Sequence, residues 1–404
     1  MQVTGLTPHE RAWRYDSDMS RHASALAPWQ VSLGGICGLV LTLGLARFAY
    51  TPLLPLLQTQ TGLTDADAGW LAAVNYAGYM TGALTASWLD DPRWRWRLYL
   101  GGLWMAVLST AAMALSPDLW VWALLRFIGG LCGATGMLLG SGLILGWLMQ
   151  QGRRPELGVH FIGIGLGIVL TAAGAWAMAG VFADWQWHWL GFALMGLLFL
   201  WPAWRFRPPP PPPTSVATPA ADNLGSRRDF VLLLASYFAA GWGFVISATF
   251  IVAMVEREPA LAGLGPWAWA MVGLAAMPAV FLWDRAARRW GERQALMMAF
   301  GLQIVSVVLP ALSTAVWAEL SGALIYGATF IALVSLMLAL VGRRAPGNPG
   351  KAMARMTLAY GVAQMLAPVV VGQMAQSSGR FDSGLWLTAA VLGVGLLLLT
   401  AVKK

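Results

Sequence analysis

Two arginines lie inside long apolar stretches, where a charge needs a special reason. Arg47 is about ten residues, or roughly 15 Å of helix, from the end of the stretch 30–57, and Arg126 is about seven residues inside the stretch 119–149. A buried guanidinium is costly unless it faces a wet cavity or a partner, and it binds carboxylate or phosphate in a bidentate manner. We therefore expect the pair to bind an anion. Alternatively, Arg47 reaches the membrane surface, or one arginine is structural and pairs with backbone carbonyls or an acid.

Neutral polar side chains occur at helical spacing in two other apolar stretches. Asn75 and Tyr79 are four residues apart, as are Tyr360 and Gln364, so each pair shares one face of a helix. Such faces are candidates to give hydrogen bonds to the same ligand. The alternative is that they only join neighbouring helices.

Two acid-first, arginine-rich turns occupy corresponding places in the two halves of the chain, at residues 90–97 and 284–293. This correspondence indicates an internal repeat. We expect the charges to form ion pairs with neighbouring helix ends that break and reform when the halves move. The alternative is that they only fix the orientation of the chain in a membrane. The candidate gating residues are Asp90, Arg93, Asp284, Arg285 and Arg288.

The composition determines which elements position these residues. Of the 404 residues, 58% are hydrophobic and only 11% are charged, whereas soluble proteins carry about 25% charged residues. The apolar residues fall in runs long enough to cross a bilayer as helices. The sequence predicts an all-α membrane protein with twelve transmembrane helices at residues 30–57, 64–89, 97–115, 119–149, 156–182, 186–205, 229–254, 266–290, 294–314, 317–341, 352–376 and 381–402.

A proline-rich segment divides this series into two sets of six. Six consecutive prolines at 208–213 favour an extended conformation without helix or strand pairing. We expect a tail at residues 1–28, an N-terminal six-helix bundle at 29–205, a linker at 206–228 and a C-terminal six-helix bundle at 229–404. The two bundles should be pseudo-symmetric.

The net charge of +8 follows the predicted topology and does not indicate nucleic-acid binding. Nearly all Lys and Arg outside the spans lie on one face, and only Arg257 and Arg380 lie on the other. The positive-inside rule then places both termini and the linker in the cytoplasm. The two cysteines, Cys37 and Cys132, lie within spans without metal-ligand spacing, so we expect no metal and no cofactor.

These features together resemble the major facilitator superfamily. The turn 284–293 is similar to its loop motif, and Arg126 with Gly130 is similar to its fourth-helix motif. More narrowly, residues 47–55 and 68–79 resemble the YbfB/YjiJ branch. The Gly-Pro of the superfamily's antiporter motif is absent from the fifth span. The resemblance implies a monomeric transporter of the bacterial inner membrane.

The sequence thus favours a secondary active transporter that works by alternating access, with a central cavity lined by the first, fourth, seventh and tenth spans. An organic anion is the expected cargo, and a proton or another ion is the candidate for coupling. The open alternatives are transport or efflux of neutral or cationic compounds, and a membrane sensor that moves no cargo. The spans hold no cluster of catalytic side chains, so we do not expect an enzyme.

Overall fold

The computed structural model describes residues 26–89, 91–152, 157–209, 227–344 and 349–402. Asp90, most of the tail and most of the proline-rich linker lie outside the described residues. Throughout the described part the secondary structure is helical, without strands. Nine of the described helices are long and apolar enough to cross a membrane. Together with three less apolar helices, α4 (Asp65–Trp88), α5 (Pro92–Ala112) and α9 (Trp185–Arg205), they form the twelve spans expected from the sequence.

The spans of the first half follow the sequence prediction within a few residues. The first span combines α2, η1 and α3, and the fourth combines α6, η2 and α7. The bounds are α2 (Pro28–Leu39), η1 (Val40–Phe48), α3 (Tyr50–Thr61), α4 (Asp65–Trp88), α5 (Pro92–Ala112), α6 (Leu119–Ala134), η2 (Thr135–Gly140), α7 (Ser141–Gln150), α8 (Gly158–Ala179) and α9 (Trp185–Arg205).

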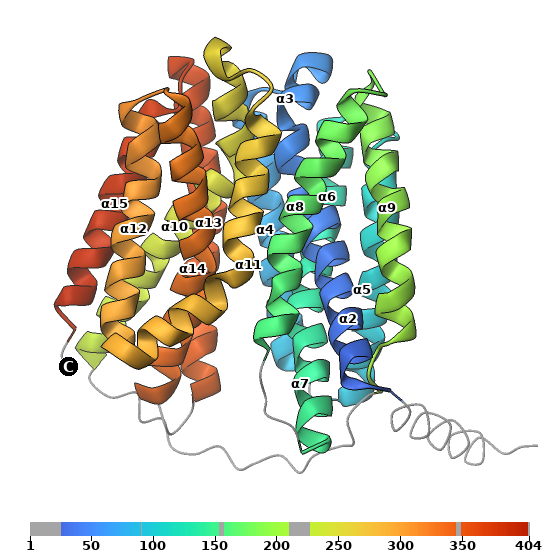
Figure 1. Cartoon of the computed structure of the whole chain (residues 1–404), viewed down its shortest axis with the longest axis vertical. Coiled ribbons are helices and arrows are strands. Elements are labelled where there is room, and N and C mark those ends of the chain that lie inside the picture. Colours follow the sequence, from blue (N-terminus) through green and yellow to red (C-terminus); the bar gives the residue numbers. More distant parts are fainter. Residues whose placement is uncertain (1–25, 90, 153–156, 210–226, 345–348, 403–404) are drawn as a thin grey trace, which may run out of the picture.

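The second half repeats the arrangement with six uninterrupted α-helices and one short 3₁₀ turn. Their bounds are α10 (Arg227–Arg257), η3 (Pro259–Leu261), α11 (Gly265–Trp290), α12 (Glu292–Leu312), α13 (Val316–Arg344), α14 (Pro349–Ser378) and α15 (Asp382–Thr400). The halves stand side by side as two bundles, blue to green and yellow to red in Figure 1.

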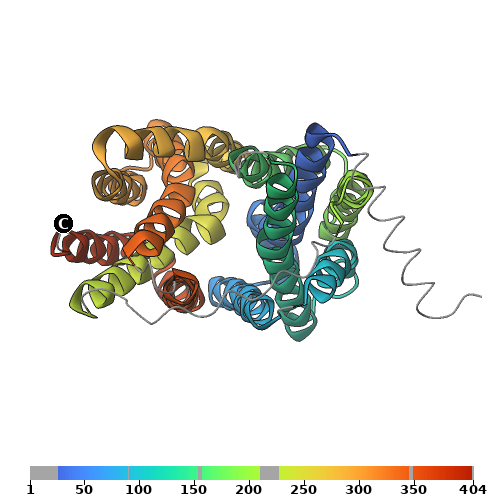
Figure 2. The ribbon, with the colours of Figure 1, turned by 90° about the horizontal axis from the view of Figure 1, so that it is seen from below.

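The bundles meet mainly through two pairs of helices, α4 with α14 and α8 with α11 (Figure 2), and α3 also contacts α10. Glycines allow this close approach. A Cβ atom on Gly69 of α4 would lie 2.0 Å from the carbonyl oxygen of Pro368 in α14, and one on Gly165 of α8 would lie 2.6 Å from the carbonyl oxygen of Gly273 in α11. Larger side chains at these positions would push the halves apart.

Burial separates central from peripheral helices. In the most apolar window, 83% of residues are buried in the first span and 94% in α10, against 39% in α12 and in α15. The first span and α10 therefore form the centre of the molecule, whereas α12 and α15 present much of their surface outward, as helices in contact with lipid do.

The first span changes its winding where Arg47 lies. Residues Val40–Phe48 form a π-helix, in which the Ala49 N–H donates to the Gly44 carbonyl oxygen five residues earlier (3.0 Å). Gly44 also packs directly on Gly167 of α8. π-Helical turns are rare and occur often at functional sites.

Candidate functional site

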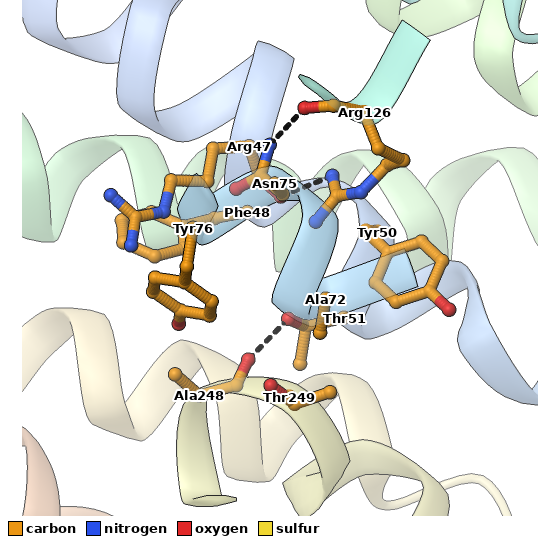
Figure 3. A pocket seen from close by; sticks show the side chains of 10 residues that line it. All are labelled: Arg47, Phe48, Tyr50, Thr51, Ala72, Asn75, Tyr76, Arg126, Ala248 and Thr249. Carbon is orange, nitrogen blue, oxygen red and sulfur yellow. Dashed lines mark hydrogen bonds between the residues drawn. The ribbon is translucent and has the colours of Figure 1, made fainter. Parts of the chain in front are cut away.

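A small enclosed space lies where the first half meets α10, and Figure 3 shows the side chains around it. Arg47 and Arg126 both line it, together with Asn75 and Tyr76 from α4 and Thr249 from α10. Its free volume is about 10 Å³, which is roughly what one water molecule needs. The structure thus brings the two predicted arginines together, in a state where no larger ligand fits.

Arg47 is held by aromatic rings. Its side chain is 6% exposed, so the alternative placement at the membrane surface is not what the structure shows. The guanidinium carbon lies 4.4 Å from the ring centre of Tyr76, 4.8 Å from that of Tyr79 and 5.5 Å from that of Phe48. Within the described residues no carboxylate pairs with it, and its Nε has no hydrogen-bond partner. Ring faces stabilise the charge, and hydrogen-bonding capacity remains.

Arg126 makes a different set of contacts. Its Nη1 donates to the carbonyl oxygen of Arg47 (3.0 Å), and its guanidinium carbon lies 4.3 Å from the ring centre of Tyr50. In a π-helix the carbonyl oxygen of Arg47 would accept a hydrogen bond from the backbone N–H five residues later. That residue is Pro52, which has no N–H. Arg126 therefore supports the backbone that carries Arg47, which is the arrangement expected if one arginine is structural.

Asn75 extends this network to α4. Its Nδ2 donates to the carbonyl oxygen of Arg126 (2.7 Å), whereas its buried Oδ1 has no hydrogen-bond partner among the described residues. Gly130 makes this contact possible, since a Cβ there would lie 2.0 Å from the Asn75 carbonyl oxygen. Asn75 therefore joins α4 to α6, in agreement with the interhelical alternative.

The second half closes the space through α10. The Thr51 hydroxyl donates to the carbonyl oxygen of Ala248 (2.5 Å), drawn as a dashed line in Figure 3. The ring of Tyr76 meets the ring of Phe244 at 6.2 Å, nearly at right angles. Residues of both halves therefore line the space that Arg47 borders.

Phe244 is the centre of a set of rings that we call the aromatic cluster. Its centroid lies 5.4 Å from that of Phe330, 6.1 Å from that of Tyr360 and 6.4 Å from that of Tyr326. The Tyr326 hydroxyl donates to the Phe244 carbonyl oxygen (2.9 Å). The members of the aromatic cluster are Tyr76, Tyr237, Phe244, Tyr326, Phe330 and Tyr360.

The predicted neutral residues are only partly brought together. Tyr79 stacks on Arg47, and Tyr360 belongs to the aromatic cluster. Gln364 is buried one turn along α14 from Tyr360, and no hydrogen bond joins it to the other predicted residues. The sequence analysis did not select two aromatic residues that contribute to the site, Tyr76 and Phe244. Tyr76 is next to the predicted Asn75 in sequence, and Phe244 carries no polar atom that could have indicated it.

The predicted gating residues on α11 make no ion pair with the first half within the described residues. Asp284 pairs with Arg288 one turn later on α11, and Arg285 is exposed beside them. Arg93 is exposed in the first turn of α5, and Asp90 lies outside the described residues. Their part in gating remains a prediction.

An ion pair does join the halves at the opposite end of the bundles, which we call the Asp65 end. Asp65, at the start of α4, pairs with Arg257, at the end of α10. Gln58 Nε2 donates to the Asp65 carboxylate (2.7 Å), and the Asp65 backbone N–H donates to Gln376 Oε1 (3.1 Å). The Arg257 guanidinium also lies 4.7 Å from the ring centre of Phe381. Next to the pair is an open hollow of about 450 Å³ lined by both halves.

Two of the solved structures that are similar to this chain are transporters. A mutant of the nucleoside transporter NupG superposes with a TM-score of 0.74 over 93% of this chain and all of its own, at 12% identity. A bacterial homologue of the human lysosomal transporter Spinster, in an inward-facing and occupied conformation, gives 0.66 over 92% of this chain and 96% of its own, at 16% identity. At these identities the likeness concerns the fold.

Sequence relatives point the same way. The uncharacterized transporter YebQ of Escherichia coli is 29% identical over 213 residues, which cover 50% of this chain and 45% of YebQ. The uncharacterized transporter mfc1 of Schizosaccharomyces pombe is 27% identical over 152 residues, 37% of this chain and 31% of its own length. The matches thus span less than half of either relative. The family model described as "Uncharacterised MFS-type transporter YbfB" matches residues 39–400. This chain belongs to that family of major facilitator superfamily membrane transporters.

Proposed function

We propose that the protein is a secondary active transporter that carries a small organic anion by alternating access. Arg47 is the observation on which the choice of an anion depends. It is a buried guanidinium without a carboxylate partner in the described residues and with its Nε unbonded, and it borders a space lined by both halves. A guanidinium in this state gains most from a ligand that supplies negative charge and acceptor oxygens.

The two arginines have separate roles in this proposal. Arg47 contacts the anion directly, because ring faces leave its donors available. Arg126 positions Arg47, because it donates to the Arg47 carbonyl (3.0 Å). Tyr79 and Tyr360 flank the anion from opposite halves, whereas Asn75 joins helices.

Alternating access is supported by how the halves contact each other. They meet through glycine-lined helix pairs and through the Asp65–Arg257 ion pair, both of which can separate without unfolding either bundle. We place the protein as a monomer in the cytoplasmic membrane of a bacterium, with both termini in the cytoplasm. The Asp65 end then faces outward, and the coupling ion is a proton or another ion.

The test is a thermal-shift screen of the purified chain against organic anions, neutral solutes and organic cations, followed by flux in proteoliposomes. A ligand that binds the folded state at 100 times its Kd stabilises it by about 2.7 kcal/mol. We expect anions to stabilise the wild type, Arg47→Gln to abolish this shift, and Arg126→Gln to weaken it. Arg380→Gln, at an arginine 62% exposed near the Asp65 end, is the matched control and should keep it.

The same screen can contradict the proposal. Stabilisation by neutral or cationic compounds alone, or a full anion shift in Arg47→Gln, would show that the arginine only holds the bundle together. Binding of an anion without flux in proteoliposomes would favour a sensor.

A further inference from the structure

The aromatic cluster continues directly from the Arg47 site into the second half. Tyr76 contributes to both, since its ring lies 4.4 Å from the Arg47 guanidinium carbon and 6.2 Å from the ring of Phe244. Beyond Phe244 come Tyr360 and then Tyr237, whose rings are 4.6 Å apart. The cation therefore stands at one end of a continuous series of aromatic faces from both halves.

This cluster differs from ordinary packing in a core. Tyr237 and Tyr360 are 2% and 9% exposed, yet neither hydroxyl makes a hydrogen bond with another described residue. Buried tyrosine hydroxyls usually find a partner. Tyr326 in the same cluster follows that rule by donating to the Phe244 carbonyl oxygen. The two free hydroxyls are therefore available to a ligand.

We infer that the transported anion is an aromatic carboxylate. Its carboxylate pairs with Arg47, and its ring stacks among Tyr76, Phe244 and Tyr360. This inference rests on the proposed function and narrows its substrate class. An organic cation, which also favours aromatic faces, is repelled by Arg47. An aliphatic anion pairs with Arg47 but gains no stacking.

Space for the ring must come from movement between the halves. The free volume beside Arg47 is about 10 Å³, so a ring enters only when Tyr76 of α4 and Phe244 of α10 separate. A bound aromatic ring then touches both bundles. Ligand binding is therefore coupled to whether the two bundles are closed or separated at this site.

The experiment compares calorimetric titrations of the full chain in detergent with benzoate, cyclohexanecarboxylate, benzyl alcohol and tetraethylammonium. The first two share a carboxylate and differ in ring character. We expect benzoate to bind about tenfold more tightly than cyclohexanecarboxylate, because aromatic pairing adds to area burial. Benzyl alcohol and tetraethylammonium should not bind measurably.

Two variants test the assignment of residues. Phe244→Leu and Tyr360→Leu should each reduce the preference for benzoate to about twofold or less and leave the affinity for cyclohexanecarboxylate within about twofold of wild type. Phe250→Leu is the matched control. It lies on α10, where its ring packs on Phe381 (5.0 Å) at the Asp65 end, and it should keep the tenfold preference. Melting curves confirm that each variant is folded.

The outcomes distinguish a failure of the aromatic-carboxylate inference from a failure of the proposed anion transport. Equal affinities for the two carboxylates in the wild type overturn the aromatic class but leave anion transport standing. An unchanged preference in both folded variants overturns the aromatic cluster as the binding surface. Binding of tetraethylammonium or benzyl alcohol without either carboxylate overturns both.

Discussion

Removing the charge of Asp65 should open the Asp65 end of the protein. The Asp65–Arg257 pair exists only when the two halves touch there, so it stabilises that closed state relative to the open one. In Asp65→Asn the carboxylate is lost, while an oxygen remains that can accept from Gln58 as before (2.7 Å). The substitution thus removes the ion pair with little change in shape.

The magnitude follows from the burial of the two partners. Breaking a fully buried ion pair costs about 3–5 kcal/mol and an exposed one about 0–1 kcal/mol. The Asp65 side chain is 7% exposed and that of Arg257 is 33% exposed, so this pair lies between the two limits. We therefore expect about 2 kcal/mol, or roughly a 30-fold shift toward the open state.

The reactivity of a cysteine introduced next to the Asp65–Arg257 pair measures this opening. Ala253 lies one turn before Arg257 on α10 and is 1% exposed, whereas the native thiols of Cys37 and Cys132 are buried elsewhere in the bundles. We expect Ala253→Cys to react with a membrane-impermeant maleimide about 30-fold faster when combined with Asp65→Asn. Arg257→Gln should give the same acceleration, and the two charge removals together no more than either alone.

The control removes a carboxylate from the same end without touching the joint between the halves. Asp382→Asn breaks the pair with Arg380, which lies within the second half. It should leave labelling unchanged. Labelling that stays within twofold of the parent in Asp65→Asn, or that rises equally in Asp382→Asn, would refute the reasoning.

Three other substitutions test how the helices are held. Gly69→Val should lower the melting temperature by several degrees and block flux, because even its Cβ would meet the α14 backbone at 2.0 Å; differential scanning fluorimetry and proteoliposome uptake measure both. Arg126→Leu should cost about 1–3 kcal/mol by removing the charged hydrogen bond to the Arg47 carbonyl, whereas an unchanged melting temperature would exclude the positioning role. Ser141→Ala, which removes a 3.0 Å bond to His160, should cost about 1 kcal/mol in the same assay and leave uptake unchanged.

The sequence alone was sufficient to predict the membrane-spanning helices and to identify the two arginines inside them. Apolar length and helix-end residues are local properties, so the predicted spans agree with the structure within a few residues. Arg47 and Arg126 were found because a charge in an apolar run is visible without any neighbour. The motifs also showed the likeness to a transporter family. That the two arginines line one site was established only by the structure.

The partners of these residues required the tertiary structure. Asp65 and Arg257 are 192 residues apart, and each alone looks like an ordinary helix-end charge. Tyr76 rather than Asn75 faces the second half, and Phe244 has no polar atom to distinguish it from other phenylalanines. The gating charges on α11 pair within their own helix, which the internal repeat did not indicate.

The sequence could not predict these contacts because the helices are surrounded by lipid and not by water. In water, a helix shows its buried face by an alternation of apolar and polar residues, so sequence predicts which side packs inward. In a bilayer, lipid is as apolar as the protein interior, so both faces of a helix carry similar residues. The sequence therefore determined which segments enter the membrane. Only the packing of the folded bundles decided how each helix is rotated, and hence which side chains meet at Arg47.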